Sequence, residues 1–209
     1  MGPQKAHRAA TALLQDGKWD LVVSTGFAGA LQDLSIGTLV AGEGVLDDPL
    51  AVPSHSPISC DAEWMEKLAK ICGPSLPFSV GRVVAVSRVL TQSEEKQNLA
   101  AVTGALAVDM ESGSIGRAAQ KLGVPFVIIR TISDGIREDL PMDFNLFQTP
   151  LGCLRGLWQC LRSPKIWKGL FRLYRQSREA GSQLTAFFQL FFAGVLASPP
   201  YSELPGTVS

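Results

Sequence analysis

The stretch Val127-Ile128-Ile129-Arg130-Thr131-Ile132-Ser133-Asp134 decides how this chain folds. Its β-branched, mostly apolar residues predict a buried strand that ends in two polar side chains. About twenty residues earlier, Val108-Asp109-Met110-Glu111-Ser112 joins a short apolar segment to an acidic helix start. Strand, helix and strand in this order indicate an α/β sheet, in which the residues that follow the strands gather at one edge. The two segments therefore place two carboxylates, Glu111 and Asp134, at one end of a sheet.

The composition fits one α/β domain. The chain has 209 residues, which is enough for a sizeable core. Its 19 basic and 19 acidic residues balance, so we expect no nucleic-acid partner. Because residues 1–5 carry no apolar segment of the kind that opens a signal peptide, we expect a cytoplasmic protein.

The spacing of the four cysteines does not match that of a metal-binding motif. None belongs to a CxxC pair, and no histidine cluster accompanies them. A disulfide framework is typical of much smaller secreted chains. We therefore expect free thiols at Cys60, Cys72, Cys153 and Cys160, with no metal and no bound cofactor.

Helical and strand patterns alternate along the first two thirds of the chain. We expect helices at 3–15, after an Asp61 N-cap, and at 110–122. We expect strands at 20–24, 37–41, 80–90, 105–108 and from Pro125 onward. The glycine-rich segment 25–30 reads as a turn after the first strand, and the three prolines in 47–60 predict a loop.

The C-terminal third has a different pattern. Apolar residues at helical spacing occupy 151–161, and Ser163-Pro164 interrupts them. A second stripe contains Ile166, Trp167, Leu170, Phe171 and Tyr174, opposite Lys168, Arg172 and Arg175. Residues 184–197 are nearly all apolar but short for a bilayer span. We predict an α/β domain at 1–148, a basic amphipathic helical extension at 149–197 and a disordered tail at 198–209.

Three segments should meet at the polar edge of the sheet. Small residues at Ala28 and Gly29 let the backbone approach a flat ligand. Glu111 can accept hydrogen bonds from the two hydroxyls of a ribose diol. Burial of Asp134 would favour its protonated form and suit proton donation near neutral pH.

Each of these residues also has a structural interpretation. Glu111 can cap a helix and complement its dipole, and Asp134 can form an ordinary Asx turn. The glycine-rich segment lacks both GxGxxG and GxxxxGK[ST] spacing. The residues alone therefore indicate an α/β enzyme with a polar edge site and go no further.

At these residues the chain resembles the purine nucleoside phosphorylase superfamily, and most of all its methylthioadenosine/adenosylhomocysteine nucleosidase branch. That branch carries a TGSAGG-like turn after a strand, a V-E-M-E helix start and a V-P-F-V-x-x-R-x-I-S-D strand. The same order here is Ser24–Gly29, Val108–Glu111 and Val124–Asp134, within a resemblance that covers roughly residues 1–145. It implies a three-layer fold with a central mixed sheet flanked by helices.

The resemblance also implies an activity, the cleavage of the N-glycosidic bond between a purine and ribose. Glu111 matches the residue that binds the ribose 2′- and 3′-hydroxyls, and Asp134 matches the general acid that protonates the purine at N7. The remaining matches line the ligand: Met110 against the sugar, Ser133 at the base, and Ala28 and Gly29 beside both.

The chain departs from the family pattern in two places. The family's first strands and its water-activating glutamate precede the segment that matches Met1–Lys5, so the resemblance predicts missing first strands, an unpaired sheet edge and a poorly soluble or inactive protein. Phe27 stands where relatives often have a serine, and Ser24 stands where phosphorylases have an arginine. These two changes weaken a standard phosphate site, although phosphate as a co-substrate stays open.

The substrate prediction depends on the C-terminal third. Residues 139–145, followed by basic and apolar helices, resemble the hopanoid-associated branch, for which the resemblance implies removal of adenine from adenosylhopane. A lipid-tailed nucleoside needs an apolar, cation-rimmed surface near the inner face of a membrane, and Trp158, Trp167, Phe171 and Tyr174 in 151–197 could supply it.

Several alternatives remain. These helices can instead cover the sheet or form the interface of a homodimer, which is the oligomer we expect. The activity can instead be that of a soluble methylthioadenosine, adenosylhomocysteine or futalosine nucleosidase. The chain can also be a catalytically inactive remnant, and hydrolysis is not separated from phosphorolysis.

Overall fold

The computed structural model describes residues 2–49, 56–72, 75–148 and 163–197. Six strands form the sheet, in the spatial order β3-β2-β4-β5-β1-β6. Their bounds are β1 Val22–Ala30, β2 Leu39–Asp47, β3 Ile58–Ser59, β4 Phe78–Ala85, β5 Ala107–Asp109 and β6 Phe126–Asp134. The described ranges contain five helices around this sheet: α1 Pro3–Gln15, α2 Ala62–Cys72, α3 Ser93–Thr103, α4 Ser112–Lys121 and α6 Pro164–Ala197, with a short 3₁₀ turn, η1, at Phe144–Gln148.

The sheet is mixed and closes on itself. Strand β6 lies parallel to β1, and the first half of β2 runs antiparallel to β6, from Leu39 opposite Thr131 to Gly42 opposite Ile128. Strand β1 pairs with β5 at Gly29 and Ala30 alone. Over Val22–Ala28 the side of β1 away from β6 has no strand partner within the described residues.

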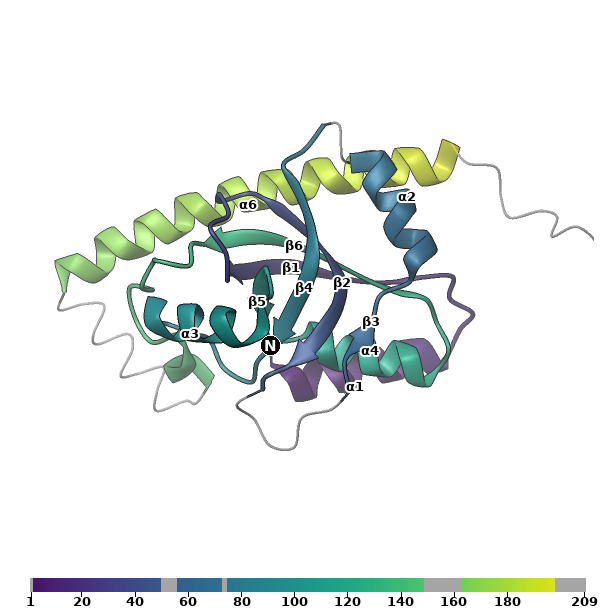
Figure 1. Cartoon of the computed structure of the whole chain (residues 1–209), viewed down its shortest axis with the longest axis horizontal. Coiled ribbons are helices and arrows are strands. Elements are labelled where there is room, and N and C mark those ends of the chain that lie inside the picture. The colour runs from purple at the N-terminus through teal and green to yellow at the C-terminus, as the bar shows by residue number, and fades with distance from the viewer. Residues whose placement is uncertain (1, 50–55, 73–74, 149–162, 198–209) are drawn as a thin grey trace, which may run out of the picture.

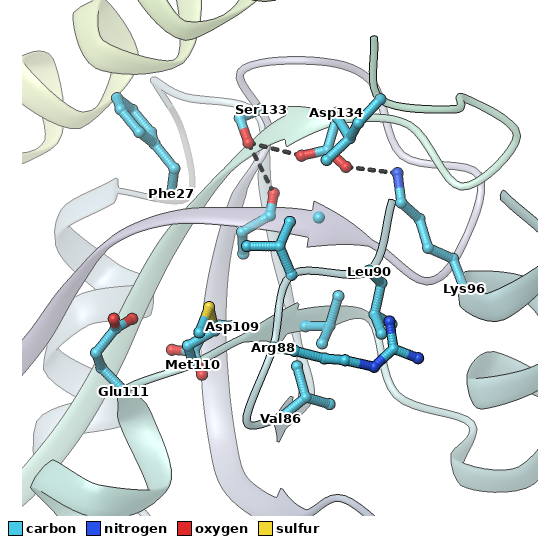
Figure 2. Close-up of a pocket in the computed structure, with 15 residues that line it drawn as sticks. Phe27, Val86, Arg88, Leu90, Lys96, Asp109, Met110, Glu111, Ser133 and Asp134 are labelled. Carbon is cyan, nitrogen blue, oxygen red and sulfur yellow. Dashed lines mark hydrogen bonds and ion pairs between the residues drawn. The ribbon is translucent and has the colours of Figure 1, made fainter. Parts of the chain in front are cut away.

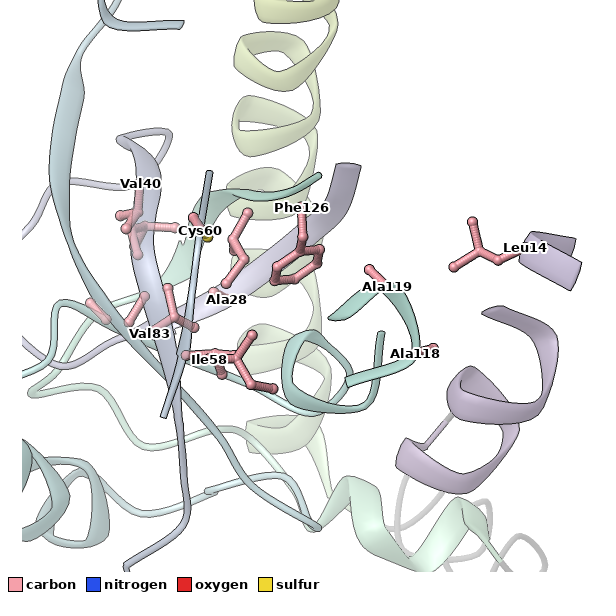
Figure 3. Packing of buried hydrophobic residues seen from close by; sticks show 14 residues of the cluster. Leu14, Ala28, Val40, Ile58, Cys60, Val83, Ala118, Ala119 and Phe126 are labelled. Atoms are coloured by element: carbon pink, nitrogen blue, oxygen red, sulfur yellow. The ribbon is translucent and has the colours of Figure 1, made fainter. Parts of the chain in front are cut away.

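Helices cover both faces of this sheet, as Figure 1 shows. On β6, Phe126, Ile128 and Ile132 belong to a core cluster that includes residues of α1 and α4 (Figure 3). The alternate residues Val127 and Ile129 belong to a second cluster, with Phe187 and Phe191 of α6 and Leu68 of α2. The strand alternation thus builds two cores, and the predicted three-layer α/β class with a central mixed sheet is confirmed.

Several local predictions hold. Helix α1 has the predicted bounds, and Asp61 caps α2 by accepting a hydrogen bond from the Trp64 N–H at 3.0 Å. The Cys60 thiol is free and buried, and burial raises its pKa to about 12.

The structure differs from the local predictions at two segments that border the hollow. The segment 25–30 is the second half of β1 and not a turn, because its backbone continues the pairing with β6. Helix α3 was not predicted, because its apolar residues lack a clear helical period. The start of this helix nevertheless has a sequence signal, a capping box in which the Glu95 carboxylate accepts a hydrogen bond from the N–H of Gln92.

The C-terminal part of the described chain is one continuous helix. Helix α6 begins at Pro164, where a proline fits the first turn, and it extends over 34 residues. Its buried positions include Ala180, Phe187 and Phe191, so the second half of α6 belongs to the core. No helix in the described ranges combines the length and apolarity needed to cross a bilayer. The predicted stripe at 151–161, including Trp158, and the tail from 198 lie outside the described residues.

Candidate active site

One hollow opens where β1, β5 and β6 end, and all six predicted site residues line it (Figure 2). Ala28 and Gly29 come from β1, Met110 and Glu111 follow β5, and Ser133 and Asp134 end β6. Its empty volume is about 550 Å³, part of which is open to solvent. The structure thus brings together three segments that lie far apart in the sequence.

A β-bulge shapes the end of β6. Ala28 lies opposite Ile132, but the next residue, Gly29, lies opposite Asp134. Ser133 is therefore the extra residue, and the normal alternation of side chains stops there. As a result two neighbouring polar residues, Ser133 and Asp134, both line the hollow, although regular strand geometry would point one of them away.

Gly29 allows Asp134 to lie close to β1. A Cβ atom at Gly29 would stand 3.1 Å from Asp134 Oδ2 and 3.3 Å from Val108 Cγ1. Both contacts are tighter than ordinary van der Waals packing. The glycine thus leaves room for the carboxylate in the hollow. This close approach, and not a turn, explains why position 29 has no side chain.

The Asp134 carboxylate is held by side chains on both oxygens. Its Oδ1 accepts a hydrogen bond from Ser133 Oγ at 2.8 Å, and its Oδ2 is 2.5 Å from Lys96 Nζ. The residue is 8% exposed. An Asx turn would direct the carboxylate to a nearby backbone N–H, so this interpretation does not describe Asp134. The buried ammonium of Lys96 lies against one oxygen of this carboxyl group, a partner that the sequence had not indicated.

Two carboxylates at the start of α4 have different partners. Asp109 accepts hydrogen bonds from the Ser112 N–H at 3.2–3.3 Å and from the Ser112 hydroxyl, so Asp109 satisfies the helix start. Glu111 occupies the N-cap position but its side chain makes no capping bond. Its Oε1 accepts instead from the Gly2 N–H at 3.2 Å. The capping role considered for Glu111 therefore belongs to Asp109.

A buried polar network supports this helix start. Arg130 Nη2 lies 2.5 Å from Asp109 Oδ2 and donates to Ser24 Oγ at 2.8 Å and to Ser112 Oγ at 2.9 Å. Burial raises the pKa of Asp109, while the Arg130 guanidinium and the Ser112 donors oppose that rise. Gly26 makes room for this guanidinium, because a Cβ there would stand 2.6 Å from Arg130 Nη1.

Sequence reasoning missed two cations that line the hollow. Lys96 lies on α3 and touches Asp134, and Arg88 follows β4 and is 2.5 Å from Glu95. The capping box at 92–95 would have located α3 and hence Lys96 near a helix start, but its distance to Asp134 depends on the fold. Phe27 is 46% exposed at the same hollow.

A family model described as "Phosphorylase superfamily" matches residues 1–150. The chain belongs to this superfamily. Among relatives, a 5′-methylthioadenosine/S-adenosylhomocysteine nucleosidase of Staphylococcus aureus is 26% identical over 167 residues, which are 70% of this chain and 71% of that protein.

Solved structures share the fold of this superfamily member. An S-adenosylhomocysteine nucleosidase of Streptococcus pyogenes has a TM-score of 0.69 at 16% identity and covers 91% of this chain and 75% of its own. A futalosine hydrolase of Helicobacter pylori has a TM-score of 0.66 at 19% identity and covers 90% of this chain and 76% of its own. At these identities the likeness concerns the fold.

Proposed function

We propose that this superfamily member cleaves the N-glycosidic bond of a 5′-substituted adenosine and releases adenine. The observation that carries the proposal is the bulge in β6, which directs Ser133 and Asp134 together into a hollow that Glu111 also lines. In this proposal Asp134 is the proton donor and Glu111 binds the sugar hydroxyls, and these are the two roles that the reaction needs. The names of the nucleosidase relatives support the same reaction class.

In the proposed mechanism Asp134 enters the reaction as the protonated acid and gives its proton to purine N7. The C1′–N9 bond then breaks with its electron pair moving to the base, and the sugar becomes oxocarbenium-like. Glu111 binds the 2′- and 3′-hydroxyls and gains attraction as positive charge develops, so it stabilises the transition state more than the substrate. Met110, Ala28 and Gly29 pack beside the sugar and base, and Ser133 orients Asp134.

We infer that water, and not phosphate, is the acceptor at C1′. Of the cations that line the hollow in the described part of the chain, Arg88 is paired with Glu95 and Lys96 with Asp134. Arg130 beneath them is paired with Asp109. A phosphate dianion would need an uncommitted cation or several free donors. Water adds at C1′ and releases one proton to solvent, and Asp134 regains its proton from solvent.

For the 5′ substituent we propose a lipid tail, as in adenosylhopane. Phe27 at the hollow approaches α6, since a Cβ at Gly181 would stand 3.8 Å from the Phe27 ring. From Gly181 a shallow groove continues along α6 between Leu184, Phe188 and Phe192. An apolar chain leaving the 5′ position could lie in this groove. A location at the inner face of a membrane belongs to this proposal, and the homodimer stays a prediction.

A soluble nucleosidase is the second candidate. The relative in Staphylococcus aureus is named for methylthioadenosine and S-adenosylhomocysteine, whose 5′ groups are much smaller than a lipid tail. A catalytically inactive remnant is the candidate from another class. Release of adenine separates this remnant from both enzymes, and preference for the 5′ group separates the enzymes from one another.

The test is adenine release from adenosines that carry methylthio, homocysteinyl, long alkyl or hopanyl 5′ groups, each with and without phosphate. We expect turnover without phosphate and the highest kcat/KM for the apolar 5′ groups. Asp134→Asn should lower kcat by about 10²- to 10⁴-fold, the usual contribution of a general acid. The control is Asp33→Asn, an exposed carboxylate that does not line the hollow.

Three results would count against the proposal. Unchanged kcat in Asp134→Asn removes the acid role, and a requirement for phosphate removes hydrolysis. If the wild-type chain releases no adenine from any of these nucleosides, the inactive remnant is the correct interpretation.

A further inference from the structure

Lys96 is a buried cation with a complete set of acceptors. Its side chain is 1% exposed, which is rare for a lysine. Besides Asp134 Oδ2 at 2.5 Å, its ammonium donates to the carbonyl oxygens of Gly135 at 2.9 Å and Glu138 at 3.0 Å. Three acceptors around one nitrogen match the three donors of an ammonium group.

These bonds connect α3 to the turn that follows β6. The Glu138 carboxylate closes this turn by accepting from the Gly135 N–H at 3.2 Å, and Arg172 of α6 holds it at 2.7 Å. Lys96 therefore fixes both the carboxylate of Asp134 and the backbone directly after it. Figure 2 shows Lys96 reaching Asp134 from the side opposite Ser133.

We propose that Lys96 is a positioning residue for the general acid, acting on the reaction only through Asp134. This inference rests on the proposed function. Lys96 fixes Oδ2 and Ser133 fixes Oδ1, so the carboxyl group has one orientation toward the base. When Asp134 gives its proton to N7 it becomes a carboxylate, and the adjacent ammonium stabilises that product of the transfer. Lys96 keeps its own three protons throughout.

The same ammonium also sets the charge beside the acid. Its Nζ lies 2.5 Å from Asp134 Oδ2, so a neutral side chain at position 96 removes a positive charge from beside the proton that the acid donates. Loss of the ammonium should therefore move the basic limb of the kcat profile to higher pH while lowering the maximum. A lysine with a purely structural role would lower the amount of folded protein and leave the profile in place.

Other charged groups surround the pair. From the turn and α6 come Glu138 and Arg172. Hydrogen bonds from Ser93 lower the pKa of Asp139 next to this turn, and Lys96 adds a smaller effect in the same direction. Three other charged residues line the hollow, Arg88, Asp109 and Glu111. Glu95 pairs with Arg88, and Arg130 pairs with Asp109. None of these ion pairs includes Lys96, so Lys96→Met removes only the Lys96–Asp134 pair among them.

The experiment is a double-mutant cycle with Lys96→Met, Asp134→Asn and the double variant. The double variant leaves no unpaired charge of this pair buried, so it can be measured even if Lys96→Met folds poorly. Purine release is measured in single turnovers, and stability in urea. We expect Lys96→Met to lower kcat by at least about tenfold with little change in KM. This loss is a part of the rate enhancement that a general acid contributes. In the Asp134→Asn background the same substitution should change kcat by less than about twofold, as expected for an effect transmitted through one residue.

Lys96→Arg keeps the charge and should recover part of the kcat and of the original pH limb. Lys67→Met is the matched control, since Lys67 pairs with Glu63 on the exposed side of α2. Equal losses of kcat in both backgrounds, or an unmoved pH limb, would overturn the role of Lys96 while the proposed function stands. A wild-type chain without activity overturns the proposed function and this role together. In that case a coupling energy between the two substitutions in the free energy of urea unfolding identifies the Lys96–Asp134 pair as structural.

Discussion

Neighbouring carboxylates in this hollow have different chemistry because their partners differ. Asp109 is bonded to Arg130 and to the start of α4, so its oxygens are committed to the fold. Glu111, two residues later, is partly exposed, and its one hydrogen bond is to a backbone N–H. Asp134 lies between a hydroxyl and an ammonium. Of the three carboxylates that line the hollow, Asp109 alone is thus bonded to the start of α4.

The position of the Asp134 carboxylate depends on the absence of a side chain at Gly29. Gly29→Ala would place a methyl group 3.1 Å from Oδ2, so the carboxylate must shift by a few tenths of an ångström. We expect kcat for adenine release to fall about tenfold to a hundredfold, since small misplacement of a reacting group is costly. Gly135→Ala is the control, because its nearest neighbour would be 3.9 Å away. Equal activity of the two variants would show that the close approach is not needed.

At the scale of elements, α6 has two dissimilar halves. Its second half is buried against the sheet through Phe187 and Phe191. Its first half exposes large aromatic side chains, with Trp167 at 58%, Phe171 at 63% and Tyr174 at 59%. Exposed basic residues accompany them at Lys168, Arg172, Arg175 and Arg178. Aromatic and cationic side chains on one exposed helical segment are typical of helices that lie on anionic membranes.

We therefore predict that the protein co-sediments with anionic liposomes and that added salt weakens this binding. Arg175→Gln should lower the partition coefficient about fivefold, since a basic residue at the surface contributes about 1 kcal/mol. Replacing Trp167 and Phe171 by alanine should weaken it further. Val102→Ala, at an exposed apolar position of α3, is the control. An absence of binding, or equal binding to neutral liposomes, would reject the membrane role of α6.

For the whole molecule, the closure of the sheet positions the site. Strand β6 is buried along its full length because it pairs with β1 on one side and with β2 on the other. The β2 pairing requires a glycine at Gly42, where a Cβ would stand 2.9 Å from Ile128 Cβ. The strand that carries Asp134 is thus held by contacts far from the hollow.

Gly42→Ala should destabilise the protein by about 1–3 kcal/mol, the usual cost of overpacking a core. The measurement is the urea midpoint of unfolding. Gly181→Ala provides the contrast, because its nearest neighbour would be 3.8 Å away in a helix where alanine is favoured by about 1 kcal/mol. A Gly42→Ala midpoint equal to that of the wild type would mean that the β2–β6 contact contributes little to stability.

The sequence by itself determined the α/β class, the bounds of α1, the cap of α2 and the identity of six residues around the hollow. These features follow from local periodicity, capping side chains and motif order, which the chain expresses over a few residues. Only the tertiary structure decided that 25–30 is a strand, that β2 closes onto β6, that Ser133 is a bulge residue and that Lys96 meets Asp134. Each of these features depends on contacts between segments far apart in the chain; Lys96 and Asp134, for example, are separated by 38 residues. A local sequence pattern does not show which distant segments meet in space.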